Sequence, residues 1–465
     1  MSTQLHTPTK RPAGMFGFGI VWAGQLVSVL ASNMSGFALT IWAFQKTGSA
    51  TVLGLVQISF MLPFLLISPI AGAMVDRYNR KLMMMVSDLG AVLATTALLI
   101  LNASGHLQVW QMCVTSVVYG LSATFQWPAY MAAISVMVPK EQYGRANGMM
   151  SLIDSGPAVF SPILAGALLP IIGLTGILTI DVVTFFLAIG ALLVVHVPQP
   201  EQTEEGQAGK GSLLHEATYG FKYIFARRSL ISLLLVILCL NLVQGISGSL
   251  FAPMILLRTN NNSASLGLVE SAFAIGGVVG GLIISAWGGF KKRIRGMLLG
   301  WAMYAVLGLI LFGLGHSLYF WIPLAIVASM SFPLTQSASN AIWQAKVAPD
   351  IQGRVFAARR LIAWLVDPIM PVLAGLMADY VTEPAMAAHT GLGRTFGWLV
   401  GNSPGSGMSL QFVISGLLYL IVIAVAWFIP VVRNVEMLLP DHDQMKKVEE
   451  TPQEQASGVV EVQSA

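Results

Sequence analysis

Residues Asp154–Ala167 read DSGPAVFSPILAGA, which places one acid and two prolines inside an otherwise apolar segment. A carboxylate near the middle of a membrane helix costs roughly 2.5 to 3.5 kcal/mol on insertion scales, so it usually faces the protein interior or a water-filled cavity. On a helix, this acid shares one face with three small residues at offsets of four, seven and eleven, namely Ala158, Ser161 and Ala165. Such a face lets another helix pack closely.

The composition is that of an integral membrane protein. Of the 465 residues, 55% are hydrophobic and only 10% are charged, whereas about a quarter of the residues of a soluble domain are charged. The formal net charge of +4 does not indicate a nucleic-acid partner, because the basic residues are scattered in short clusters between apolar runs. The two cysteines, each inside an apolar run, offer neither a disulfide framework nor a Cys-rich metal site.

At about 20 residues per span, the apolar runs predict twelve transmembrane helices in two sets of six. The first set is 16–45, 51–75, 82–103, 108–138, 144–170 and 174–197; the second is 229–257, 264–290, 295–315, 318–347, 354–382 and 409–432. The predicted fold is an all-α membrane protein with one six-helix bundle at 16–197 and another at 229–432. The remaining segments are an N-terminal tail (1–15), a linker ending in an amphipathic helix (198–228) and a C-terminal tail expected to be disordered (433–465).

The distribution of Lys and Arg predicts the orientation. With the N-terminus inside, only Lys46, Arg258 and Arg394 of the 25 basic residues fall on the outer side. By the positive-inside rule, both termini are expected in the cytoplasm.

The two halves repeat. Tyr143-Gly-Arg145 recurs as Gln352-Gly-Arg354, and Pro162-Ile-Leu-Ala-Gly166 recurs as Pro371-Val-Leu-Ala-Gly375, both at an offset of 209. A parallel repeat of six helices is the layout of transporters built from two bundles around a midplane site. Asp154 becomes Ala363 in the second copy, so the acid is not required by the repeated scaffold.

A glycine, an aspartate and three basic residues follow the second predicted span: Gly72, Asp76, Arg77, Arg80 and Lys81. The aspartate can accept hydrogen bonds from a helix N-terminus while the arginines pair with acids when the cytoplasmic side is shut. Asp88 is close enough along the chain to be their gate partner. Positive-inside anchoring is the alternative, but it explains only the cations. The group closely resembles the cytoplasmic signature of the major facilitator superfamily, with Asn79 in place of the usual glycine.

The segment 154–167 is similar to the antiporter motif of the same superfamily. The motif Gly-Pro-x-x-Gly-Gly corresponds to Ser161-Pro-Ile-Leu-Ala165-Gly166, and further likeness to its macrolide-efflux and enterobactin-export branch runs through 24–28, 45–49 and 353–360. The resemblance covers nearly all of 16–432. It implies a drug:proton antiporter that exports amphipathic small molecules, and it implies that helices five and eight pack across the domain interface.

Glu270 on the eighth predicted helix is a counterpart of Asp154, because small residues follow it at the same offsets of four, seven and eleven. The hypothesis is that Asp154, Glu270 or both exchange protons as access alternates. The alternative is that each acid caps or pairs near its helix end. The residues expected to pack this interface are Pro157, Ser161, Pro162, Ala165, Gly166, Gly277 and Gly281.

Polar and aromatic residues inside other spans predict a mostly apolar substrate cavity: Gln25, Asn33, Gln126, Trp127, Asn241, Gln244, Gln336, Asn340 and Trp343. In lipid such groups need partners, so they are expected to point inward, although helix-to-helix hydrogen bonding is the alternative for each one. The glycine-rich loop at 383–408 is either a lid or a connector.

The sequence predicts a secondary active transporter. It shows no phosphate-loop spacing, no metal-ligand spacing among its seven His and no nucleophile with a matching base, so neither an enzyme nor a cofactor or metal is expected. We expect a monomer that uses protons to export an amphipathic drug, antibiotic, siderophore or other secondary metabolite. One alternative is a flippase for lysophospholipids on the same fold; another is a membrane receptor that binds without transporting.

Overall fold

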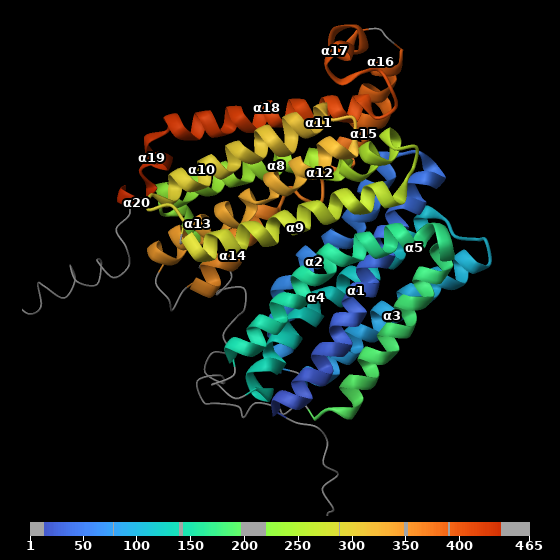
Figure 1. Cartoon of the computed structure of the whole chain (residues 1–465). Helices are drawn as coiled ribbons and strands as arrows, with labels where there is room; N and C mark the ends of the chain where they lie inside the picture. Colours follow the sequence, from blue (N-terminus) through green and yellow to red (C-terminus); the bar gives the residue numbers. More distant parts are fainter. Residues whose placement is uncertain are drawn as a thin grey trace, which may run out of the picture. The chain divides into compact units, whose positions relative to one another are not determined.

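The computed structural model describes residues 14–77, 79–138, 143–196, 220–287, 289–347, 352–388 and 391–438. Every regular element within these ranges is helical, as the all-α prediction requires (Figure 1). Nine of the helices in the described ranges are long and apolar enough to cross a membrane. One of the nine contains a bend that divides it into two limbs, and further helices occupy the remaining predicted spans, so the arrangement is consistent with twelve spans.

The first half consists of α1 (Gly14–Thr47), α2 (Ala50–Arg77), α3 (Arg80–Ala103), α4 (Val109–Met137) and α5 (Tyr143–Val194). The 52-residue α5 bends at Gly173, which has a φ of 65°. Glycine adopts this left-handed conformation without the penalty that a Cβ would bring. The bend falls between the two spans predicted at 144–170 and 174–197, so the fifth and sixth spans are the two limbs of α5.

The second half begins with α8 (Arg228–Arg258) and α9 (Ser263–Trp287). The later elements are α10 (Arg293–Met303), π-helix η2 (Tyr304–Leu311), α11 (Phe312–Leu314), α12 (Leu318–Ser329), α13 (Ser331–Lys346), α14 (Gln352–Trp364), α15 (Met370–Met377), π-helix η3 (Ala378–Thr382), α16 (Glu383–Ala387), α17 (Leu392–Val400), α18 (Ser406–Phe428), α19 (Pro430–Arg433) and α20 (Val435–Leu438). The glycine-rich loop therefore contains two short helices.

The eleventh predicted span, 354–382, is interrupted in the structure. α14 ends at Trp364, residues 365–369 form turns, and α15 begins at Met370. Pro368 lies in this break, where its ring removes one N–H donor and disfavours helical geometry at the preceding residue. The span is therefore two helical segments and not one continuous helix.

Most of the two predicted tails and of the linker lies outside the described residues, although 14–15 belong to α1 and 435–438 of the tail predicted to be disordered form the short helix α20. Within the predicted linker at 198–228, residues 220–225 are helical.

By their internal contacts, the residues form two compact units. The first comprises 1–209, 248–274 and 368–408, and the second comprises 210–247, 275–367 and 409–465. The first unit thus joins the whole first half to one end of α8, the start of α9 and the segment from α15 to α17. These contacts cut across the two six-helix bundles that the sequence predicts.

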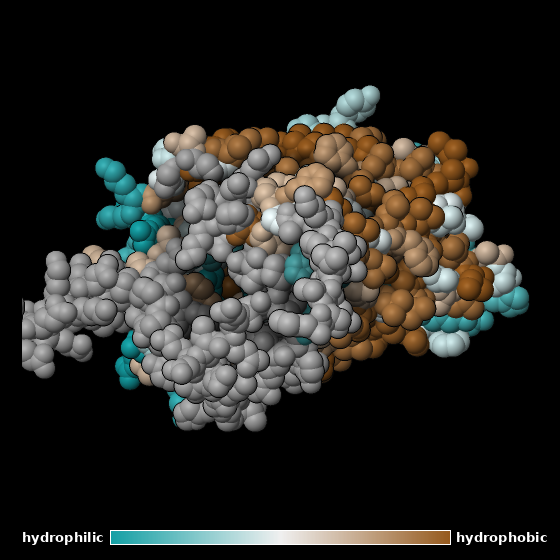
Figure 2. All heavy atoms as spheres, turned by 90° about the horizontal axis from the view of Figure 1, so that it is seen from below, coloured by the Kyte–Doolittle hydropathy of each residue, from teal (hydrophilic) through white to brown (hydrophobic). Residues whose placement is uncertain are grey.

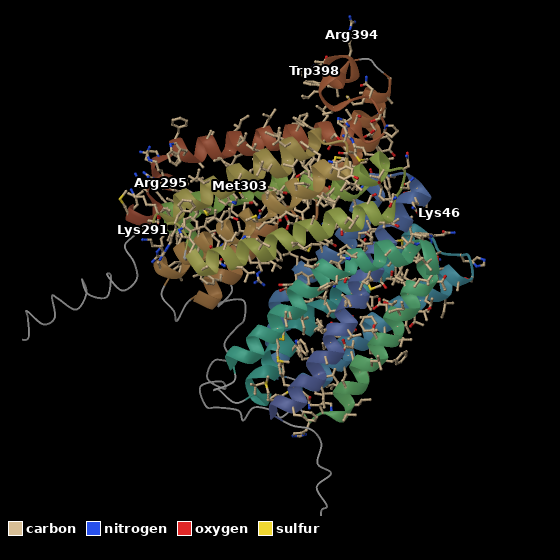
Figure 3. The ribbon with its side chains drawn as sticks, in the orientation of Figure 1. Lys46, Lys291, Arg295, Met303, Arg394 and Trp398 are labelled. Atoms are coloured by element: carbon tan, nitrogen blue, oxygen red, sulfur yellow. The ribbon has the colours of Figure 1, made fainter. Side chains whose placement is uncertain are left out.

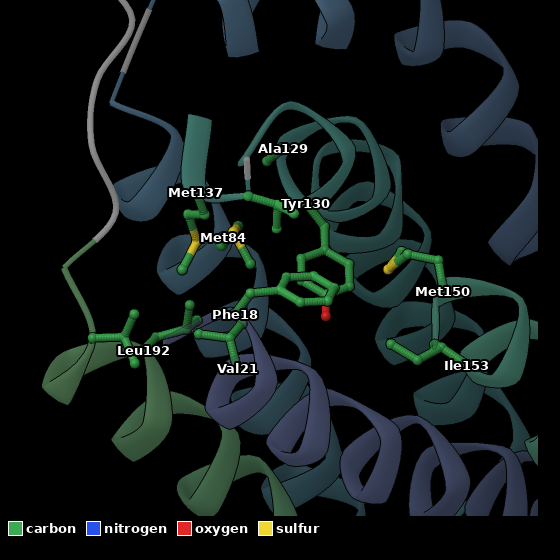
Figure 4. Packing of buried hydrophobic residues seen from close by; sticks show 11 residues of the cluster. Phe18, Val21, Met84, Ala129, Tyr130, Met137, Met150, Ile153 and Leu192 are labelled. Atoms are coloured by element: carbon green, nitrogen blue, oxygen red, sulfur yellow. The ribbon is translucent and has the colours of Figure 1, made fainter. Parts of the chain in front are cut away.

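A cluster of apolar side chains fills one end of the first half (Figure 4). Phe18 of α1 stacks with Tyr130 of α4 at a ring-centroid distance of 6.4 Å. Met84 of α3 and Met150 of α5 are buried in the same cluster. Unbranched, polarisable methionine side chains fill irregular spaces between helices. The cluster packs the beginning of α5, next to Asp154, against α1.

The outer faces of the helices are apolar. Figure 2 shows mostly hydrophobic side chains over the described part of the face that it draws. Leu66 of α2, Leu93 of α3 and Phe186 of α5 are each more than 60% exposed. Side chains of this kind are stable on such a surface when lipid, and not water, surrounds them.

Candidate functional site

A buried carboxylate joins three helices of the first half. Asp88 on α3 is fully buried. Its Oδ2 accepts a hydrogen bond from Nε2 of Gln25 on α1 at 3.1 Å, and its Oδ1 accepts one from Nε2 of Gln126 on α4. The Gln126 amide also donates to Oε1 of Gln25 at 3.1 Å. The structure therefore brings together three residues that were predicted at two different sites, the gate and the cavity, in one satisfied polar network.

A second buried carboxylate lies on the second limb of α5, after the bend at Gly173. Asp181 is 1% exposed, and its Oδ1 accepts a hydrogen bond from Oγ of Ser32 on α1 at 2.8 Å. Its Oδ2 has no hydrogen-bond partner among the described residues. Asp181 is not among the residues that the sequence predicted for a site. The first half thus holds two acids whose described hydrogen-bond donors are all neutral.

Pro162 and Gly166 of the segment 154–167 pack α5 against the start of α9. Oγ of Ser263 donates to the carbonyl of Gly166 at 3.1 Å, and Oγ of Ser271 donates to the carbonyl of Val159 at 2.8 Å. A Cβ on Gly267 would overlap the carbonyl oxygen of Pro162. Pro162 and Gly166 thus contact α9 closely, and Ser263, Gly267 and Ser271 form the small-residue stripe on the α9 side.

A matching crossing joins α2 to α15. A Cβ on Gly54 would lie 2.6 Å from the carbonyl oxygen of Pro371, and a Cβ on Gly375 would lie 2.5 Å from Cα of Thr51. Asp379, on η3, lies at the N-terminus of α2. Its carboxylate accepts hydrogen bonds from Oγ of Ser49 at 2.5 Å, from the N–H of Ala50 at 3.0 Å and from Thr51 through the N–H at 3.0 Å and the hydroxyl at 2.7 Å. The sequence argument did not include this acid, although it lies one helical turn after the repeated Gly375.

Most of the predicted gate cannot be placed, because four of its residues lie outside those whose side chains the structure describes. These four are Gly72, Asp76, Arg77 and Arg80. Lys81 is described, and its ammonium donates to the carbonyl oxygens of Leu193 at 3.2 Å and Val195 at 2.8 Å. These carbonyls end the second limb of α5, where a cation at a helix C-terminus is favourable. Lys81 therefore ties the start of α3 to the end of α5.

The two acids proposed for coupling differ in how they are described. The side chain of Asp154 lies outside the described residues, whereas Glu270 on α9 is partly buried. Gly277 and Gly281, which follow Glu270 on α9, have open space where a Cβ would be. The neighbouring glycines Gly276 and Gly280 instead approach α12 and the residue that follows it, because backbone atoms of Ile326 and Met330 lie where a Cβ would be.

Two of the five predicted cavity residues in the second half, Asn241 and Asn340, make side-chain hydrogen bonds within the chain. Nδ2 of Asn241 donates to the carbonyl of Ala363 at 2.8 Å, and Oδ1 of Asn340 accepts from Arg359 at 3.2 Å. The same guanidinium lies 5.1 Å from the ring centroid of Trp343. Trp343 is fully buried, and its Nε1 has no hydrogen-bond partner among the described residues. Gln244 is partly buried and Gln336 is exposed.

In the first half, two of the predicted cavity residues contribute little to a described site. Asn33 is exposed and donates only to the carbonyl of Val29, four residues earlier on α1, while the side chain of Trp127 lies outside the described residues. Tyr130, which the sequence did not single out, is buried with a hydroxyl that has no hydrogen-bond partner among the described residues.

The loop after η3 is held by an acid of its own. The carboxylate of Glu383 accepts hydrogen bonds from the N–H groups of Met408 at 2.8 Å and Gly405 at 3.2 Å. Burial raises the pKa of Glu383, against the lowering effect of these hydrogen bonds and of the nearby Arg258. Arg258 also donates to the carbonyl of Val400 at 2.8 Å, which fixes the end of α17. Figure 3 shows the side chains of Arg394 and Trp398 on α17 pointing away from the rest of the 383–408 loop.

The described residues contain no group of three or more His, Cys, Asp or Glu side chains placed to hold a metal ion. The polar groups of the site are carboxylates, amides and hydroxyls on membrane-spanning helices. Such groups can bind protons and polar parts of a small molecule.

Comparison with known proteins gives the family. A model described as Major Facilitator Superfamily matches residues 21–371. The chain is 28% identical over 368 residues to Macrolide efflux protein A of Streptococcus pyogenes, which covers 78% of this chain and 90% of that protein. It is 27% identical over 377 residues to Multidrug efflux pump Tap of Mycolicibacterium fortuitum, covering 77% of this chain and 90% of that protein.

Solved structures agree on the fold. A bacterial homologue of the human lysosomal transporter Spinster, in an inward-facing and unoccupied conformation, superposes with a TM-score of 0.67 at 16% identity over 88% of this chain and 96% of that chain. A bacterial homologue of the iron transporter ferroportin superposes with a TM-score of 0.61 at 14% identity over 88% of this chain and 98% of that chain. The matched family region exceeds half of the chain, and the resemblance drawn from the sequence motifs is confirmed. The chain belongs to the Major Facilitator Superfamily and is a multi-pass membrane transporter, not an enzyme.

Proposed function

We propose that the chain exports an amphipathic small molecule in exchange for protons, by alternating access across the bacterial cytoplasmic membrane. The observation that carries this proposal is the match to relatives named for macrolide and multidrug efflux, which spans more than three quarters of the chain and about nine tenths of each relative. A likeness of this extent includes both halves of the transporter. It therefore supports a cargo of the same chemical class more strongly than the fold alone does.

The proposed orientation places both termini in the cytoplasm, and the proposed active form is the monomer. The support for the orientation is the distribution of Lys and Arg, of which only Lys46, Arg258 and Arg394 fall on the proposed outer side. In this orientation, the α2/α15 and α5/α9 crossings lie at the outer end.

Proton coupling is proposed at Asp154 and Glu270. The support is chemical: a carboxylate on an apolar helix is costly unless it has a role or a partner. Asp88 and Asp181 are also buried, but both oxygens of Asp88 and Oδ1 of Asp181 accept hydrogen bonds from donors within the first half. We therefore assign Asp88 to holding α1, α3 and α4 together and keep Asp154 and Glu270 as the coupling pair.

The proposed substrate path is mostly apolar with few polar groups. Its support includes the buried hydroxyl of Tyr130 and the buried indole N–H of Trp343, each without a hydrogen-bond partner among the described residues. An unsatisfied buried donor is unfavourable, and a substrate oxygen or nitrogen that pairs with it gains that energy. An amphipathic cargo with a few acceptor atoms fits such groups better than a highly charged cargo does. The gate proposed at Gly72, Asp76, Arg77, Arg80 and Lys81 would close the cytoplasmic end of the path.

The test is flux of a panel of amphipathic compounds, macrolides included, in proteoliposomes with an imposed pH gradient. The native chain is expected to move at least one compound against its gradient when protons flow the other way. Asp154→Asn and Glu270→Gln are expected to lose this driven transport while keeping exchange of labelled for unlabelled compound without a pH gradient. Glu383→Gln, which changes a carboxylate outside the spans, is the matched control and is expected to keep both activities.

Three results would contradict the proposal. Driven transport that is unchanged in Asp154→Asn and in Glu270→Gln would remove both residues from coupling. Movement of labelled lysophospholipid with no movement of any drug-like compound would favour lipid flipping, and binding without flux would favour a receptor.

A further inference from the structure

The two repeated Pro-x-Leu-Ala-Gly segments make the same kind of helix crossing. In the first copy, Gly166 packs against the backbone at the start of α9, and Pro162 meets the glycine one turn further along α9. In the second copy, Gly375 packs against the backbone at the start of α2, and Pro371 meets Gly54, one turn further along α2. Each crossing therefore joins one half of the chain to the first turn of a helix in the other half.

The second copy has an acid one turn beyond its repeated glycine, and the first copy does not. Asp379 lies one turn beyond Gly375, and the residue at the same place in the first copy is Pro170. The α5/α9 crossing is held by two neutral hydroxyls, whereas the α2/α15 crossing is held by one carboxylate that accepts four hydrogen bonds from Ser49, Ala50 and Thr51. The repeat explains the shared backbone contact, but it does not account for the acid.

The chemistry of this contact suits a reversible attachment. The first N–H groups of a helix have no partner within the helix, and a carboxylate there satisfies them and interacts favourably with the positive end of the helix dipole. Hydrogen bonds to an ionised acceptor are stronger than neutral ones. Asp379 is also partly exposed, so water can replace its partners when the helices separate. A fully buried pair would resist separation far more strongly.

We propose that the Asp379 carboxylate is a latch, which holds the second half on the N-terminus of α2 when the outer end is closed and must release each time that end opens. Asp379 is thus a positioning residue that sets the balance between the two access states. This inference rests on the alternating access of the proposed function.

The experiment measures that balance directly, without substrate. Lys46 in the first half and Arg394 in the second half are both exposed (Figure 3). Spin labels on Lys46→Cys and Arg394→Cys, in a background with Cys113→Ala and Cys239→Ala, report the separation of the outer ends by double electron–electron resonance in lipid nanodiscs. The variants are Asp379→Asn, the pair Ser49→Ala and Thr51→Ala, and all three changes together.

Glu383→Gln is the matched control. It removes a carboxylate only four residues from Asp379, but its hydrogen bonds go to Gly405 and Met408 within the second half. Asp379→Asn is expected to raise the ratio of long to short distances by about tenfold or more, since capping and charge-assisted hydrogen bonds are lost. The serine and threonine pair is expected to act in the same direction, and the triple variant is expected to fall short of the product of the two effects because both act on one interaction. The control is expected to match the native chain.

A shift in Asp379→Asn no larger than that in Glu383→Gln would overturn the latch, as would multiplicative effects in the triple variant. If Asp379→Asn fails to fold, the double variant Ser49→Ala and Thr51→Ala tests the latch by itself. An unchanged ratio of long to short distances in that variant contradicts the proposal. The measurement needs no cargo, so it is distinct from the flux test. A latch that moves as expected in a chain that transports no tested compound would leave the latch standing and refute the proposed export.

Discussion

Replacing Gly54 by alanine is expected to open the α2/α15 crossing by sterics alone. The added Cβ would lie 2.6 Å from the carbonyl oxygen and 2.7 Å from the carbonyl carbon of Pro371, and 2.8 Å from the N of Val372, whereas ordinary contact begins near 3.4 Å. All three atoms belong to the backbone, so no side-chain rotation relieves the overlap and the two helices must move apart. Overpacking of this kind costs about 1–3 kcal/mol.

The overlap costs free energy only in the access state in which α2 and α15 are in contact. The substitution therefore changes the free-energy difference between the two access states. It corresponds to a shift of roughly 5- to 150-fold toward the state in which this end is open. The gain in helix propensity from glycine to alanine, about 1 kcal/mol, is the same in both states and cancels from the ratio.

The assay is the distance distribution between labels at the Lys46 and Arg394 positions. Gly36→Ala is the control, because Gly36 on α1 has nothing within 4 Å of the place where a Cβ would be. The long-distance population is expected to be larger in Gly54→Ala than in the native chain, and unchanged in Gly36→Ala. Equal distributions in the two variants would refute the view that backbone contact at this crossing depends on glycine.

Three further outcomes follow from the described contacts. Gln126→Leu leaves the buried carboxylate of Asp88 with one donor fewer and is expected to lower the free energy of unfolding by about 1–3 kcal/mol; thermal unfolding in detergent checks it, and an unchanged midpoint would contradict the network. Lys346→Met removes an ammonium that is 3% exposed and donates to a backbone carbonyl of α20 at 2.6 Å, so a similar loss is expected in the same assay. In intact cells, a membrane-impermeant thiol reagent is expected to label Lys46→Cys and not Lys291→Cys; the opposite pattern would reverse the proposed orientation.

The fold was predictable from the sequence because its determinants are local. The length of each apolar run sets a span, and the bend at Gly173 falls between two predicted spans because glycine alone tolerates that backbone conformation. The break at Pro368 was missed, although proline also acts locally, because the apolar character of 354–382 continues through it. Apolar periodicity does not report such an interruption.

The partners of the polar side chains were not predictable, because they depend on how each helix is rotated about its axis and where it crosses its neighbour. Gln25, Asp88 and Gln126 were each recognised as polar residues in apolar spans, but only the packing of α1, α3 and α4 shows that they bind one another. The contact of Asp379 with Ser49 spans 330 positions in the chain. The repeat marked Gly375 as the counterpart of Gly166, but a pattern within one helix cannot identify the helix N-terminus that it meets.

The proposed exchange of cargo for protons is tested most directly by measuring the proton movement that a gradient of the compound drives. Proteoliposomes containing a transported compound and a trapped pH-sensitive dye are diluted into compound-free buffer at equal pH on both sides. The account predicts that efflux of the compound drives protons inward and acidifies the lumen, that empty vesicles show no such change, and that Asp154→Asn or Glu270→Gln abolishes it. Efflux of the compound through the native chain with no change in lumenal pH would contradict proton coupling.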